Sequence, residues 1–207
     1  MKDISRHLAV CVSTEMEGAL LRPHVPVVCT GVGAVNATYA LTRFLTRENV
    51  EMVVVCGIGG AYPGSGLAIG DVVCAESECY GDLGADSAEG FLDMRALGFP
   101  VVGGSAPIYN DLPLGIFPSE RRARFVTVNT CTGSDRTAAV IAARTGGAVE
   151  NMEGAAIAHV GVLAGVRVGE IRGISNLVGN RDKSAWRVKE AAEAAQLALL
   201  HWITRKG

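Results

Sequence analysis

Short runs of β-branched and apolar residues alternate along this chain with longer segments of helical pattern. Several of the short runs, such as VVVCG, are continuously apolar, which is typical of strands buried on both faces of a sheet. This alternation predicts an α/β fold with a largely parallel sheet that helices cover on both sides. The expected strands are His7–Val12, Val25–Thr30, Met52–Gly57, Asp71–Ala75, Arg124–Val128, Ala148–Glu150 and Gly169–Ser175.

The helical segments lie between these strands and are joined to them by short, turn-rich connections. No low-complexity linker divides the 207 residues, so we expect a single domain spanning residues 1–207. One segment, Glu76–Leu114, interrupts the alternation with glycines, prolines and acidic residues, and we expect a long loop there. A binding loop and a surface excursion both fit its composition. The expected helices are Thr14–Leu21, Ala34–Arg47, Asp135–Arg144, Met152–Ala164 and Lys183–Thr204.

Composition excludes several classes of protein. With 49% hydrophobic and 19% charged residues, the chain is not of the disordered type. The net charge is −2, and the only basic cluster is the short run Arg121–Arg124, so we expect no nucleic-acid partner. No apolar stretch reaches 18 residues, and the apolar run near the start is short for a signal peptide. We therefore expect a cytoplasmic protein with no membrane span.

Cofactor and metal motifs are incomplete in this sequence. The six cysteines form no C-x-x-C pair and the four histidines form no H-E-x-x-H motif, so we predict neither a disulfide framework nor a metal site. No Gly-Lys pair occurs, which excludes a P-loop. The G-x-G sequences that begin at Gly31 and Gly57 both lack the third glycine of a dinucleotide site. We expect no cofactor.

Four segments place polar or glycine residues at the carboxyl ends of expected strands, where open α/β sheets gather their ligands. Helix capping explains the carboxylates in two of them equally simply, and tight turns explain the glycines. An apolar side chain beside a carboxylate, as at Met152 and Glu153, also suits a sugar, because the carboxylate accepts its hydroxyls. The four segments are Ser13–Arg22, Val53–Val73, Ala148–Val160 and Ile171–Asp182.

The order G-x-G-G-A, GDVV, E-N-M-E-G-A-A-I-A-H-V and R-G-I-S-N resembles the nucleoside phosphorylase and nucleosidase superfamily over nearly the whole chain. Within it, the segments ECYGDLGADSAEGFLDMRALGFP, TVNTCTGSDR and SNLVGNRDKSAW resemble the futalosine hydrolase family, which is similar to methylthioadenosine/S-adenosylhomocysteine nucleosidases. The resemblance implies a three-layer αβα fold with a central mixed, mostly parallel sheet. It also implies a homo-oligomer that releases hypoxanthine from futalosine, leaving dehypoxanthinylfutalosine, on a route to menaquinone.

The resemblance also implies roles for individual residues. Glu17 rather than Glu15 matches the catalytic carboxylate when E-G-A-L-L-R is aligned with the corresponding helix of the family. Arg136, Arg181 and the loop around Tyr80–Phe91 are further candidates for the benzoate end of futalosine, and Asp182 is a candidate proton donor. The implied catalytic residues are Glu17 and Asn176, and the implied substrate-binding residues are Gly59, Gly60, Met152 and Glu153.

Two choices of chemistry follow from the residues present. A phosphorolytic relative needs arginines for phosphate, but the corresponding segments are acidic at Glu15–Glu17 and contain no arginine at Met52–Gly60, which favours hydrolysis. Asn176 stands where adenine-specific relatives carry Asp, and an amide offers N–H donors to the N7 and O6 acceptors of hypoxanthine. A methylthioadenosine-type nucleosidase, a purine nucleoside phosphorylase and a non-catalytic nucleoside-binding protein stay open as alternatives.

Overall fold

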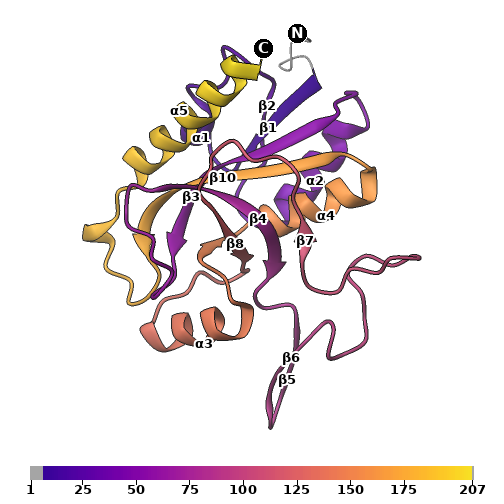
Figure 1. The fold of residues 1–207 in the computed structure, drawn as a ribbon, viewed down its shortest axis with the longest axis vertical. Helices are drawn as coiled ribbons and strands as arrows, with labels where there is room; N and C mark the ends of the chain where they lie inside the picture. Colours follow the sequence, from indigo (N-terminus) through magenta and orange to yellow (C-terminus); the bar gives the residue numbers. More distant parts are fainter. Residues whose placement is uncertain (1–6, 207) are drawn as a thin grey trace.

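The computed structural model describes residues 7–206, which form a mixed eight-stranded sheet with helices packed against it (Figure 1). Residues 1–6, at the charged start of the chain, lie outside the described residues. The strands of the sheet are β1 (Leu8–Val12), β2 (Val27–Cys29), β3 (Met52–Ala61), β4 (Val72–Tyr80), β7 (Leu112–Pro113), β8 (Arg122–Thr127), β9 (Val149–Asn151) and β10 (Arg167–Leu177), and β5 (Gly84–Ser87) and β6 (Gly90–Asp93) form a separate hairpin. The helices are α1 (Glu15–Gly18), α2 (Ala34–Leu45), α3 (Asp135–Thr145), α4 (Gly154–Ala164), the 3₁₀ turn Lys183–Ala185 and α5 (Val188–Lys206).

The sheet curls into a partly closed barrel. Its strand order is β10-β4-β8-β9-β3-β1-β2, and β10 also pairs with β3, which joins five strands in a ring. The pairings β1–β2, β1–β3, β3–β10, β4–β8 and β8–β9 are parallel, whereas β3–β9, β4–β10 and β4–β7 are antiparallel. The sheet is therefore mixed, but an arrangement of three flat layers is not confirmed. The long strands β3 and β10 each pair with several neighbours, and a bulge at Ser175 adds local twist to β10.

Strand β3 shows why the strand sequences read as continuously apolar. Val53 and Val55 belong to one buried cluster with residues of α2 and α4, whereas Met52 and Val54 belong to another with residues of α5. Successive side chains of a strand point to opposite faces, so both faces need apolar residues when helices cover both. The helices α2 and α4 thus lie on one side of the sheet and α5 on the other.

Three segments differ from the sequence prediction. Strand β3 does not stop at Gly57 but continues to Ala61, and β4 extends to Tyr80. The segment Glu76–Leu114 is therefore not one long loop, because it contains the end of β4, the β5–β6 hairpin that projects from the body in Figure 1, and the short strand β7. The last predicted helix is two elements, because the chain is extended at Trp186 between the 3₁₀ turn and α5.

No helix within residues 7–206 combines the length and hydropathy needed to cross a membrane. The cysteines are all free in this described part of the chain, and four of them are buried. Burial of Cys11, in the first strand, raises the pKa of its thiol to about 12. These cysteines behave as small core residues, as their apolar sequence context predicts.

Candidate active site

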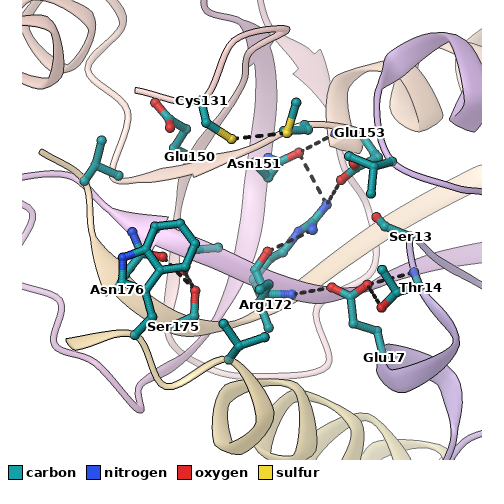
Figure 2. A pocket seen from close by; sticks show the side chains of 18 of the residues that line it. Ser13, Thr14, Glu17, Cys131, Glu150, Asn151, Glu153, Arg172, Ser175 and Asn176 are labelled. Atoms are coloured by element: carbon teal, nitrogen blue, oxygen red, sulfur yellow. Dashed lines mark hydrogen bonds and ion pairs between the residues drawn. The ribbon is translucent and has the colours of Figure 1, made fainter. Parts of the chain in front are cut away.

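A pocket of about 230 Å³ is formed by residues at the carboxyl ends of β1, β3, β9 and β10. Its floor is made of buried charged and polar side chains, namely Glu17, Asn151, Glu153 and Arg172. Its mouth is made of partly or largely exposed side chains, namely Met16, Val32, Arg181 and Trp186. Figure 2 shows Glu17 and Asn176 on opposite sides of the pocket, with Arg172 between them.

The structure brings most of the predicted site residues together. The predicted residues that line the pocket are Glu17, Gly59, Gly60, Met152, Glu153, Asn176 and Arg181. Arg136 and Asp182 are not among the described residues that line it. Arg136 is exposed on α3, and exposed Asp182 caps the 3₁₀ turn by accepting from the backbone N–H of Ser184 at 3.0 Å.

Glu17 joins the first helix to the pocket. Its side chain is 3% exposed, and its Oε2 accepts from the backbone N–H of Thr14 at 2.9 Å and from the Thr14 hydroxyl at 2.8 Å. This is the reciprocal half of a capping box, so the capping interpretation of the sequence also applies. Its Oε1 accepts from the N–H of Ile58 at 3.0 Å, which leaves that oxygen with acceptor capacity towards the pocket. Glu15, by contrast, is exposed and paired with Arg22.

Arg172 occupies the centre of the floor and was not anticipated from the sequence. Its guanidinium donates to Glu170 Oε1 at 2.7 Å, to the carbonyl of Ile58 at 2.9 Å and to Asn151 Oδ1 at 3.3 Å, and it lies 3.6 Å from Glu153 Oε2. Burial opposes its charge, but the surrounding carboxylates, Glu170 foremost, more than offset this and raise the pKa of Arg172.

Glu153 is hydrogen-bonded both to the segment before α2 and to β9. Its Oε1 accepts from the N–H of Gly33 at 2.9 Å, and its backbone N–H donates to Asn151 Oδ1 at 2.9 Å. The carboxylate is 4% exposed and stands at the start of α4, where it precedes the first helical residue, Gly154. The floor therefore presents two carboxylates, Glu17 and Glu153, with Arg172 between them (Figure 2).

The glycines of β3 make room for this arrangement. A Cβ on Gly57 would lie 2.6 Å from Glu17 Oε1 and 3.0 Å from Arg172 Nη1. A Cβ on Gly60 would lie 3.1 Å from Asn176 Nδ2. The glycines therefore let the β3 backbone lie close to side chains of the site as well as to a ligand. Gly59 and Gly60 also line the pocket.

Asn176 lies next to the bulge in β10. Its Oδ1 accepts from the Ser175 hydroxyl at 2.8 Å, and its Nδ2 donates to the carbonyl of Leu177 at 3.0 Å. An amide nitrogen has two hydrogens, and one of them is used in the bond to Leu177. One N–H is therefore free for a ligand, rather than the two expected from the sequence.

A second polar cluster supports the side of the pocket near Cys131 and Glu150. Glu150 accepts from the Tyr62 hydroxyl at 2.7 Å and from the backbone N–H of Thr132 at 2.9 Å. Cys131 contacts the sulfur of Met152 at 3.2 Å. These contacts place the Met152 thioether on the pocket wall, in the position of an apolar cover beside Glu153.

Arg181 is the charged residue of the mouth. Its guanidinium lies 5.2 Å from the centre of the Trp186 ring, a cation–π distance. It makes no ion pair with any of the described residues, whereas the other arginine of the pocket, Arg172, is engaged by two carboxylates. The mouth thus offers a cation to an incoming anionic group.

No group of three or more His, Cys, Asp or Glu side chains in the described part of the chain is arranged to hold a metal ion. The buried residues that sequence reasoning missed are Asn151, Glu150, Glu78, Glu170 and Arg172. A charged residue inside an otherwise apolar strand, as in E-I-R-G-I-S, was the signal that could have indicated Arg172 and Glu170.

Comparisons with known proteins agree with this architecture. Residues 12–204 match the protein family described as the phosphorylase superfamily. A futalosine hydrolase from Thermus thermophilus is 37% identical over 187 residues, covering 86% of this chain and 80% of the relative. A futalosine hydrolase from Acidothermus cellulolyticus is 38% identical over 174 residues, covering 80% of this chain and 69% of the relative.

A solved structure shares the fold at lower sequence identity. The 5′-methylthioadenosine/S-adenosylhomocysteine nucleosidase from S. pneumoniae, determined with a transition-state inhibitor, superposes with a TM-score of 0.81 at 19% identity, covering 97% of this chain and 99% of that one. The chain therefore belongs to the phosphorylase superfamily and, within it, to the family of the futalosine hydrolases.

Proposed function

We propose that this protein hydrolyses the N-glycosidic bond of futalosine and releases hypoxanthine and dehypoxanthinylfutalosine. Identities of 34–38% with three futalosine hydrolases over most of the chain support the substrate. The observation that carries the hydrolytic mechanism is the buried Glu17 carboxylate, which keeps acceptor capacity on Oε1 at the edge of the pocket. This reaction would belong to a route to menaquinone, as the resemblance to the futalosine hydrolase family implies.

Glu17 orients a water molecule below C1′ of the ribose and removes its proton. A carboxylate is suited to activating a neutral nucleophile, and proton transfer to a positioned base contributes about 10²–10⁴-fold to the rate. The hydrogen bonds from Thr14 and Ile58 hold the carboxylate in one orientation, so little reorganisation precedes the reaction.

Glu153 and Met152 hold the ribose. The Glu153 carboxylate accepts ribosyl hydroxyls, and the Met152 thioether covers the sugar face. Cleavage of the bond to N9 develops positive charge on the sugar, and the carboxylates of Glu17 and Glu153 stabilise that charge electrostatically. Arg172 balances the two carboxylates when the site is empty and holds Glu153 in place.

Asn176 stabilises the departing base. Its one free N–H donates to N7 or O6 of hypoxanthine, which are both acceptors. An amide is not an acid, so the leaving group departs by hydrogen-bond stabilisation or with a proton from another source. Asp182 is a poor donor in this structure, because hydrogen bonds from Ser184 lower the pKa of its carboxyl and it lies away from the pocket lining.

Phosphorolysis fits the pocket less well than hydrolysis. Phosphate needs cations that are free to bind it. Arg172 is already engaged by Glu170 and Glu153, and Glu17 stands where a phosphate would approach the sugar from the floor. An anion there meets two carboxylates in a buried environment, which is strongly unfavourable.

Arg181 binds the carboxylate of the benzoate end of futalosine. The pocket volume of about 230 Å³ is smaller than the roughly 300–1,000 Å³ that is usual for ligand pockets, so a long 5′ substituent extends into the mouth. The floor is acidic, so the anionic end of the substrate is favoured at the mouth, where Arg181 is its cationic partner and Trp186 offers an aromatic surface.

The protein acts as a cytoplasmic homo-oligomer of single-domain subunits. Exposed apolar side chains on or beside α2, with Val35 82% and Tyr39 62% exposed, support a self-association surface. Sedimentation analysis of the purified chain tests this: a single monomeric species at micromolar concentration would contradict it.

The function is tested by incubating the protein with futalosine, inosine and methylthioadenosine in phosphate-free buffer and identifying the released base. Release of hypoxanthine from futalosine without phosphate is the expected result. Release of adenine as the faster reaction favours the methylthioadenosine-type nucleosidase, and a requirement for phosphate favours a phosphorylase. Binding by calorimetry with no released base would contradict an enzymatic role.

A further inference from the structure

Two carboxyl groups lie beneath the floor of the pocket and take no part in the proposed mechanism. Glu78 on β4 and Glu170 on β10 are both 0% exposed. A Cβ placed on Gly154 would lie 2.2 Å from Glu78 Oε1 and 2.3 Å from Glu170 Oε2, so both carboxyls converge on the same point beside the start of α4. A side chain at position 154 would therefore displace these carboxyls.

The two groups have different partners. Glu170 Oε1 accepts from Arg172 Nε at 2.7 Å, but Glu170 Oε2 is buried without a hydrogen-bond partner in the described part of the chain. Glu78 accepts from the Thr127 hydroxyl at 3.1 Å and from the side-chain amide of Asn151. A buried carboxylate oxygen without a hydrogen-bond donor destabilises the folded protein. We therefore expect a neighbouring group to donate a hydrogen bond to Glu170 Oε2.

The charges around these groups identify the donor. Among the residues that the structure describes, four buried carboxyl groups face one buried cation, Arg172; they belong to Glu17, Glu78, Glu153 and Glu170. Burial, reinforced by the charge of Glu170, raises the pKa of Glu78 well above its usual range. Burial also raises the pKa of Glu170, but the adjacent Arg172 opposes that effect. Because Arg172 bonds Glu170 directly and the donors to Glu78 are uncharged, the charge is favoured on Glu170 and the proton on Glu78.

We propose that Glu78 is a neutral carboxylic acid that donates a hydrogen bond to the Glu170 carboxylate, and that this pair positions Arg172 and Asn151 in the floor. Glu170 fixes Arg172 directly. Glu78 fixes Asn151, whose Oδ1 accepts from the backbone N–H groups of Glu153 at 2.9 Å and Gly154 at 2.7 Å. One proton thus supports both the arginine and the start of the helix that carries Glu153.

The groups that face Glu78 come from every element packed against it. On β4, burial and the charge of Glu78 raise the pKa of Cys79 and of Tyr80, each to about 12, so both stay neutral. On β8 and β9 it faces Thr127 and Asn151, which do not titrate. Glu170 and Arg172 face it from β10, and the amino end of α4 faces it at Gly154 with Glu153 beside it. Loss of the Glu78 proton therefore adds one uncompensated negative charge.

The pH dependence of stability tests this without substrate. A carboxyl whose pKa is raised by folding stabilises the folded state fully only below its unfolded value of about 4.3, and this stability is lost as pH rises towards the folded pKa. We expect the unfolding temperature of the parent protein to fall by about 3–5 °C per pH unit in this range from this group alone. Glu78→Gln, which mimics the neutral acid, removes that slope.

Glu76→Gln is the matched control, because Glu76 lies on the same strand and is exposed. It should keep the slope of the parent protein. Equal slopes for the parent and Glu78→Gln would overturn the proposal. This measurement does not depend on the identity of the substrate, so the proposal and the proposed function fail independently.

Activity provides the second readout, and this part rests on the proposed function. Glu78→Gln keeps both hydrogen-bonding positions and should lose the decline in kcat/KM that accompanies deprotonation of Glu78 as pH rises, whereas Glu78→Leu removes them and should lower kcat about 10²-fold through displacement of Arg172 and Glu153. The same decline with rising pH in Glu78→Gln, or a loss of kcat in Glu78→Gln as large as in Glu78→Leu, would contradict the neutral acid.

Discussion

On the floor of the pocket, Glu17, Glu153 and Arg172 are at most 4% exposed, and each is held by several hydrogen bonds or ion pairs. At the mouth, Arg181 is exposed and rests against the face of Trp186. The floor residues come from α1, β9, the start of α4 and β10, whereas Arg181 and Trp186 both come from the segment after β10. The proposed catalytic carboxylate is thus fixed by contacts with several parts of the fold, whereas the arginine proposed to meet the far end of the substrate is not.

This difference has an energetic consequence. Removing one partner of a buried charged pair costs about 3–5 kcal/mol because it leaves the other charge buried and unpaired. An exposed cation–π contact is worth only about 0.5–1 kcal/mol. Variants of the floor should therefore change turnover and stability together, and variants of the mouth should change substrate preference alone.

The largest effect is expected at Glu17. Glu17→Gln removes the base that activates water while keeping the side-chain shape, so kcat should fall about 10²–10⁴-fold with little change in the circular dichroism spectrum. Glu15→Gln, two residues away on the same helix but exposed, should behave like the parent protein. Turnover of Glu17→Gln near that of the parent would remove Glu17 from the mechanism.

Arg172→Lys tests whether the floor needs a guanidinium or only a positive charge. A lysine cannot bond Glu170, Ile58 and Asn151 at once, so Glu153 should shift and kcat/KM should fall about 10²-fold, with a lower unfolding temperature. The control is Arg167→Lys on the same strand, where the side chain is exposed and its ion-pair distance is 3.9 Å. Full activity in Arg172→Lys would show that charge alone suffices.

The residues of the pocket differ in how far the sequence alone predicts them. Glu17, Met152, Glu153 and Asn176 follow strands in recognisable motifs, and the structure places all of them at the pocket. Arg172 was missed because its role depends on partners from distant parts of the chain, such as Ile58 and Asn151, whose proximity only the folded barrel creates. A charged residue within a predicted strand does not indicate a functional site until the residues packed around it are known.

The barrel itself was missed for the same reason. Alternating apolar patterns identify strands and helices, but the pairing of β3 with β10 joins segments more than a hundred residues apart, and local pattern does not specify it. The acidic residues and glycines that follow Glu78 predict a long loop there. In the structure Glu78 is a strand residue at full burial, where a carboxyl group is stable because it is paired and hydrogen-bonded.

A smaller effect is expected where the floor meets the base. Asn176→Asp replaces an amide N–H donor with a carboxyl that can accept from the amino group of adenine, so the ratio of kcat/KM for methylthioadenosine over futalosine should rise by about 5–150-fold, the equivalent of 1–3 kcal/mol. Asn49→Asp, an exposed change of the same charge, is the control. An unchanged substrate ratio would show that Asn176 does not contact the base.

The smallest effect, and the sharpest test of the comparison, is expected at the mouth. Arg181→Gln removes the cation offered to the benzoate carboxylate, so KM for futalosine should rise about tenfold with kcat nearly constant, because a charge-assisted hydrogen bond contributes about 1.5–3 kcal/mol when buried and less at an exposed site. Inosine, which lacks the carboxylate, should be hydrolysed as by the parent protein. Lys183→Gln, in the same exposed segment but outside the pocket lining, is the matched control. A parallel fall in kcat for both substrates would place Arg181 on the leaving base instead, and the mouth would then share in the chemistry that we propose for the floor.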